Sequence, residues 1–174
     1  MSIKFGTSGW RGILADEFTF PRLRIAVQAI ADYLREEKLH NRHVVIGYDT
    51  RFLSEEFAKT AAGVLAANGM ESLLCNRDTP TPVVAFEVLH VKAAAGLNIT
   101  ASHNPPWDCG YKVRSETGAA IAPDALKEIE YRNGTLWVTL RDGIDGHALA
   151  RQAATRSLQM KNESGAKWRL QPAS

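Results

Sequence analysis

The chain is 174 residues long, 45% of them hydrophobic and 23% charged, with a formal net charge of +2 at pH 7. This size and balance are typical of a globular protein with one domain, or one domain with an appendage. A net charge this small argues against nucleic acid or a membrane as a partner, no apolar run is long enough to span a bilayer, and the two cysteines, Cys75 and Cys109, form no disulfide framework. We therefore expect a reduced, soluble, cytoplasmic protein.

Helical and strand patterns alternate along the first 128 residues. Apolar side chains recur at helical spacing over residues 20–37. Short apolar runs predict buried strands at 43–48, 70–75 and 94–100. Two more helices are expected between these strands, with Ser54 and Thr81 as their N-caps. This order is typical of βαβ units and predicts an α/β fold, a mostly parallel or mixed sheet flanked by helices.

The pattern weakens after residue 128. Residues 1–128 carry 14 Lys and Arg against 15 Asp and Glu, whereas residues 129–174 carry 7 against 4. A short strand at 135–140 and a helical stretch near 147–160 are the elements expected there. We therefore predict a domain over 3–128 and an irregular tail over 129–174, such as a truncation or a change of reading frame would produce.

Two polar stretches follow predicted strands directly, "DTR" at 49–51 and "TASHNPP" at 100–106. In sheets of this kind ligands bind beyond the carboxyl ends of the strands, so both stretches are candidates for one site. Ser102 could be the nucleophile of a hydrolase, but no G-x-S-x-G elbow surrounds it, and the adjacent His103 is poorly placed to be its base. Asn104 and the two prolines after it stiffen the loop.

A serine in a rigid loop without a base suits a phosphoryl carrier, because phosphoryl transfer depends mostly on positioning and on cations. An ordinary polar loop is the alternative. The stretch "FGTSGWRG" at 5–12 supports the first interpretation, since its glycines let backbone N–H groups approach an anion and Arg11 offers a fork of donors. An ordinary turn with a surface arginine is the alternative here.

Three charged residues complete the candidates. Asp49 and Arg51 follow a strand, and we interpret them as a structural ion pair or a support for the site. Lys112 lies in the strand-like segment "GYK". A functional lysine there would face the Ser102 loop and titrate lower than usual, whereas most such lysines are simply solvated.

Four segments taken together resemble a known family. They are "FGTSGWRG", "IGYDTR", "DTPTPVV" and "NITASHNPP" with the "GYK" that follows it. In this order they are similar to the N-terminal domain of the α-D-phosphohexomutases, above all the phosphoglucomutases and phosphomannomutases. The resemblance runs from about residue 3 to about residue 128.

The resemblance implies a chemistry for these residues. Ser102 would carry a phosphoryl group, convert a hexose phosphate to the bisphosphate and take back the other phosphoryl group, which moves phosphate between C1 and C6. His103 would shape the site or handle protons, and Lys112 would be the general acid or base. The substrate- or phosphate-binding positions would be Ser8, Arg11 and Asn104. Hexose 1,6-bisphosphate would be the activator, and Mg2+ would bind Ser102 through its phosphoryl group.

The chain departs from the family pattern in two respects. Cys109 replaces the asparagine that usually precedes the glycine of this turn. The family's metal aspartates and sugar-recognition loops come from three later domains, and no D-x-D-x-D-R segment is present here. We therefore expect an inactive fragment, or one part of an enzyme completed by the missing domains or a second chain. A non-catalytic phosphosugar-binding or regulatory module is the alternative.

Overall fold

The computed structural model describes residues 3–6, 9–141 and 170–171, and these form one mixed sheet with helices on both faces. The strands are β1 (Gly9–Ile13), β2 (Val44–Tyr48), β3 (Ser72–Cys75), β4 (Ala95–Ile99), β5 (Asp108–Arg114) and β6 (Leu170–Gln171). The helices are α1 (Phe20–Glu36), α2 (Ser54–Ala67), α3 (Thr81–His90) and α4 (Pro123–Arg141). The predicted α/β class is confirmed.

The strand order across the sheet is β1-β5-β4-β2-β3-β6. Strands β3, β2 and β4 run parallel, because α2 and α3 carry the chain back between them. Strands β1 and β5 are antiparallel to their neighbours. The sheet is therefore parallel in its middle and antiparallel on both sides, with β5 and β1 on one side and β6 on the other.

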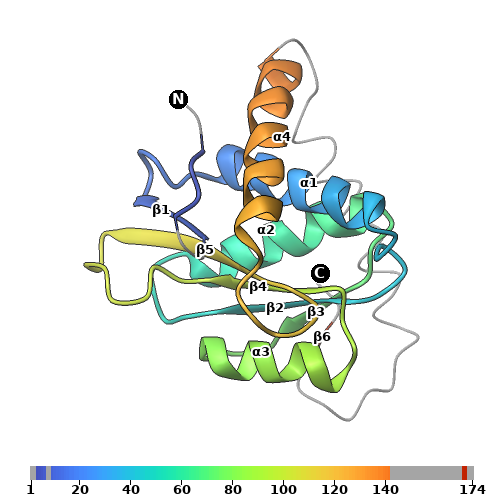
Figure 1. Ribbon diagram of the computed structural model, residues 1–174. Coiled ribbons are helices and arrows are strands. Elements are labelled where there is room, and N and C mark those ends of the chain that lie inside the picture. The colour runs from blue at the N-terminus through green and yellow to red at the C-terminus, as the bar shows by residue number, and fades with distance from the viewer. Residues whose placement is uncertain (1–2, 7–8, 142–169, 172–174) are drawn as a thin grey trace.

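Helices α1, α2 and α4 lie on one face of the sheet and α3 lies on the other (Figure 1). The larger core fills the first interface and includes the fully buried side chains of Leu23, Ile30, Ile46, Leu97 and Ile129. On the other face α3 approaches β2 closely, since a Cβ atom at Gly47 would lie 2.4 Å from Cγ2 of Val84. Because α3 spans only the middle of the sheet, it contacts β2 and β4.

The N-terminus of α1 is capped by Thr19, whose side chain accepts a hydrogen bond from the Arg22 N–H at 3.4 Å. The predicted caps at Ser54 and Thr81 are wrong by one position: Leu53 and Pro80 precede the two helices, and neither provides a side-chain cap. Both hydroxyls have other partners.

Helix α4 contradicts the strand predicted at 135–140. The helix begins at Pro123 and continues to Arg141, and its Leu126 and Ile129 are buried in the core. Arg132 donates to Glu36 of α1 at 2.8 Å, which ties the two helices together. This tertiary packing outweighs the local β-pattern of the segment.

The helical stretch expected near 147–160 lies outside the described residues. The division of the chain at residue 128 stays a prediction, and α4 runs across that position. In the described part of the chain, no helix combines the length and apolar character needed to cross a membrane.

Candidate functional site

The two polar stretches predicted to share a site do lie side by side at one edge of the sheet. Strands β2 and β4 are parallel neighbours, so the loops after Tyr48 and Ile99 leave the sheet together. The Asp49 N–H donates to the Ile99 carbonyl at 3.0 Å, which joins the two loops at their base. The site is thus built where the parallel part of the sheet meets β5.

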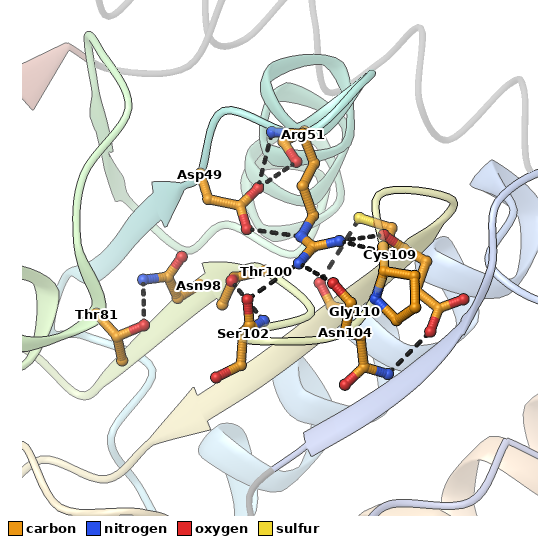
Figure 2. A network of polar contacts seen from close by, with 12 residues as sticks. Asp49, Arg51, Thr81, Asn98, Thr100, Ser102, Asn104, Cys109 and Gly110 are labelled. Carbon is orange, nitrogen blue, oxygen red and sulfur yellow. Dashed lines mark hydrogen bonds and ion pairs between the residues drawn. The ribbon is translucent and has the colours of Figure 1, made fainter.

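Arg51 connects the two loops through main-chain carbonyls (Figure 2). Its Nη2 donates to the carbonyl oxygens of Ser102 at 3.0 Å and Asn104 at 2.7 Å. Its Nη1 donates to those of Pro105 at 2.6 Å and Asp108 at 3.0 Å. One guanidinium therefore holds four carbonyls of the loop that carries Ser102.

Asp49 fixes the position of that guanidinium. Its Oδ2 lies 3.1 Å from Nε of Arg51, and its Oδ1 accepts the backbone N–H of Arg51 at 3.1 Å. The hydroxyl of Ser54 donates to the same Oδ1 at 2.9 Å. Ser54 is the first residue of α2, so its side chain orients Asp49 from inside the helix instead of occupying the N-cap position.

Ser102 has an exposed side chain on an unusual backbone. Its φ of 60° lies in the left-handed region, and its N–H donates to Oγ1 of Thr100 at 3.0 Å. Figure 2 shows its side chain pointing away from the Arg51 guanidinium. His103 beside it is exposed as well. A fixed backbone thus presents the Ser102 hydroxyl to solvent.

Asn104 faces its own loop. Its Nδ2 donates to the Asp108 carboxylate at 2.9 Å, and its N–H donates to the Ala101 carbonyl at 3.2 Å. These contacts close the turn before β5. The second prolyl residue, Pro106, has no N–H and cannot compete for any of these acceptors.

The first segment of the site differs from expectation. Arg11 does not lie in a glycine-rich loop but in β1, where it pairs with Gly110 of β5. Glycine is uncommon in strands, so the local pattern carries no strand signal there. Ser8, the other residue expected from this segment, lies outside the described residues. Arg11 is exposed and is held next to the strand that carries Lys112.

Lys112 is partly buried in β5, where it pairs with Gly9 and Asn98 on the two neighbouring strands. Burial lowers the pKa of its ammonium group, the positive charges of Arg11 and Arg114 lower it further, and Asp49 opposes them. A lysine of this kind loses its proton more readily than a solvated one. This is the direction that a general acid or base at neutral pH requires.

Cys109 is fully buried in β5. Burial raises the pKa of its thiol to about 11, so the group is neutral at physiological pH and is not an activated nucleophile. Cys75 is also buried, and both cysteines are free thiols.

Three site residues were missed from the sequence. Thr100 holds the Ser102 N–H, Ser54 orients Asp49, and Asn98 donates from its side-chain amide to the Thr81 hydroxyl at 3.1 Å. A threonine two residues before a loop serine is the pattern of a local side-chain turn, so Thr100 could have been found. The other two depend on contacts between distant segments.

An open cleft of about 380 Å³ lies on the other side of Arg51, beyond the ends of β2 and β3. Four carboxylates line it, those of Asp49, Glu55, Glu56 and Asp78. They outnumber the two arginines of the lining, Arg51 and Arg77, so the formal charge of the lining is negative and does not favour phosphate. Among the described residues, no group of three or more His, Cys, Asp or Glu side chains could hold a metal ion.

Comparison with known proteins gives a consistent result. Residues 2–134 match the family model described as phosphoglucomutase/phosphomannomutase, alpha/beta/alpha domain I. A phosphoribomutase of Saccharomyces cerevisiae is 39% identical over 127 residues, which are 70% of this chain and 20% of the relative. A phosphoglucomutase of Staphylococcus saprophyticus is 36% identical over 135 residues, 75% of this chain and 24% of the relative.

Among solved structures, a "putative phosphomannomutase" from Thermus thermophilus superimposes with a TM-score of 0.72 at 44% identity. The match covers 75% of this chain and 30% of the other. The chain therefore spans only about a fifth to a quarter of the length of the curated relatives described above.

Proposed function

Because the chain belongs to the phosphoglucomutase/phosphomannomutase family through its domain I, we propose that it is the phosphoserine-bearing part of a phosphohexomutase. Such an enzyme is an intramolecular phosphotransferase that interconverts hexose 1-phosphate and hexose 6-phosphate through a bisphosphorylated sugar. The observation that carries the proposal is the exposed Ser102 hydroxyl on a loop whose backbone Arg51 holds. We also propose that the protein is cytoplasmic, because its two cysteines form no disulfide framework.

The proposed step loads Ser102 from a hexose 1,6-bisphosphate. The Oγ–P bond forms while the bond between phosphorus and the sugar oxygen breaks, and the serine proton ends on that sugar oxygen. Lys112, with its lowered pKa, is the proposed carrier of this proton. Arg11 lies on the adjacent strand and would offset the negative charge of the phosphoryl group.

The other site residues have proposed supporting roles. His103 is exposed directly after Ser102 and would shape the site or handle a proton. Asn104 closes the loop and would keep the phosphate-binding surface in place. Asp49 and Arg51 would hold the backbone of the loop in place and would not contact the substrate. Ser8 would bind phosphate, as the family resemblance implies.

Magnesium would neutralise the charges of the two phosphoryl groups. The described residues do not fit a complete site for it, because they include no cluster of potential ligands. Ser102 would contribute one oxygen, through its phosphoryl group. We propose that the remaining carboxylates come from further domains or from a second chain, and that these 174 residues alone are inactive or nearly so in mutase turnover.

The test is phosphorylation of Ser102. The folded chain is incubated with glucose 1,6-bisphosphate and Mg2+, and with ribose 1,5-bisphosphate in parallel because one relative is named a phosphoribomutase. We expect intact-mass measurement to find one phosphoryl group in the chain and in the control Ser115→Ala, and none in Ser102→Ala. A chain that binds glucose 1-phosphate but never becomes phosphorylated would contradict the proposal and indicate a non-catalytic binding module.

A further inference from the structure

We propose that Arg51 is a positioning residue that sets the backbone of the Ser102 loop, so that the serine hydroxyl faces away from the protein. The catalytic meaning of this assignment rests on the proposed function of Ser102. Its structural content rests on the contacts of Arg51 alone.

The guanidinium of Arg51 has no donor left over. An arginine side chain carries five N–H donors, one on Nε and two on each Nη. The Nε donor goes to Asp49, and the four Nη donors go to the four loop carbonyls. The side chain is only 13% exposed. A structural ion pair would need Asp49 alone, so the four bonds to the loop indicate a further role.

The bonds determine which way the loop peptides turn. The Ser102 carbonyl points at Arg51, and in a trans peptide the N–H of His103 must then point to the opposite side. That is the side on which the Ser102 side chain lies in Figure 2. The hydroxyl and this backbone donor therefore both face away from Arg51, on the side where a seryl phosphate would form.

The loop needs such a holder because its backbone is strained. A serine with a φ of 60° adopts a conformation that L-residues with a side chain disfavour, and it persists only where the surroundings impose it. Between β4 and β5 the loop forms no helix or strand, so no regular pattern of backbone hydrogen bonds holds it. Arg51 and Thr100 are the residues that fix Ser102, one through its carbonyl and the other through its N–H.

Lysine cannot replace Arg51 in this arrangement. An ammonium group has three donors and no plane, so at least two of the five acceptors would lose their partner. The carboxylate of Asp49 is also needed, because it orients Nε while Ser54 holds it from the start of α2.

The experiment follows hydrogen exchange by mass spectrometry on peptides covering residues 98–110. In Arg51→Lys we expect the Asn104 and Asp108 amides, both hydrogen-bonded within the loop, to exchange on the order of ten times faster, as the loss of about two hydrogen bonds implies. Exchange in α1 and β2 should stay unchanged. The matched control is Arg77→Lys, which alters an exposed arginine of the same sheet edge. Asp49→Asn, with nearly the same volume, provides the same comparison if Arg51→Lys fails to fold.

Wild-type exchange of the loop amides in both folded variants would overturn the proposal. The rate of Ser102 phosphorylation is measured on the same samples, and we expect it to fall in Arg51→Lys and not in Arg77→Lys. If the wild-type chain never takes up a phosphoryl group, the proposed function fails, while the exchange data still decide whether Arg51 holds the loop.

Discussion

At the scale of the residue, Lys112 is repelled by the positive charges around it. Two cations, Arg11 and Arg114, act on a lysine that is already partly buried, and the carboxylate of Asp49 compensates only in part. Such an arrangement costs folding free energy whenever the lysine is protonated. The phosphoryl group proposed for Ser102 would relieve this repulsion, because it would bring negative charge close to Lys112.

The lowered pKa of Lys112 predicts that the stability of the fold depends on pH. The folded pKa of Lys112 is lower than the unfolded one, so between the two values the unfolded chain binds more protons and stability rises with pH. The wild type therefore carries the cost of the buried charge near pH 7 and has lost most of it near pH 10.5. The stability of Lys112→Met relative to the wild type should be greater near pH 7 than near pH 10.5. Urea unfolding at both pH values measures this, with Lys4→Met, which alters an exposed lysine, as the control. A difference that does not change with pH would contradict the prediction.

The site residues divide into those that a sequence can indicate and those that it cannot. The loops around Asp49 and Ser102 follow strands, and strand ends are positioned by hydrophobic pattern alone, so their meeting at one edge was predictable. The contacts of Arg51 were not, because its four carbonyl partners lie more than 50 positions away along the chain. Polar contacts of this kind leave no periodic signal.

At the scale of the element, the helices and strands with strong apolar periods were predicted to within a few residues, as for α1 and β2. The failures have physical causes. Strand β1 is rich in glycine and forms through pairing with β5. Helix α4 contains a β-like segment and is held by packing against α1. In both cases a distant partner outweighs the local preference.

Helix α4 yields a prediction about where the folded unit ends. Ile129 is fully buried in the main core, one position beyond the predicted boundary. Ile129→Ala should therefore destabilise the chain by about 2–5 kcal/mol, as other large-to-small core substitutions do. Chemical denaturation measures the loss, and Lys127→Ala, on the exposed face of the same helix, should change stability by less than about 0.5 kcal/mol. Equal effects of the two substitutions would mean that α4 does not belong to the core.

At the scale of the whole molecule, the fold places the proposed phosphoryl-carrier loop beside only a few cations. A seryl phosphate is close to dianionic at neutral pH, and a sugar phosphate brings a similar charge. Arg11, Lys112 and Arg114 are cations on the two strands beside the loop, whereas the neighbouring cleft is lined by carboxylates. These cations by themselves offset only part of the repulsion between the two anions.

We therefore predict that the folded chain shows no mutase turnover in a coupled assay with glucose 1-phosphate, Mg2+ and catalytic glucose 1,6-bisphosphate, with circular dichroism confirming the fold. Loading of Ser102 needs one encounter, whereas turnover needs the sugar bisphosphate to be retained and reoriented between two transfers. Retention requires a clamp for the distal phosphate, which the family resemblance assigns to later domains. Turnover that disappears in Ser102→Ala would contradict this prediction, and its dependence on chain concentration would then tell whether a second copy of the chain contributes the missing ligands.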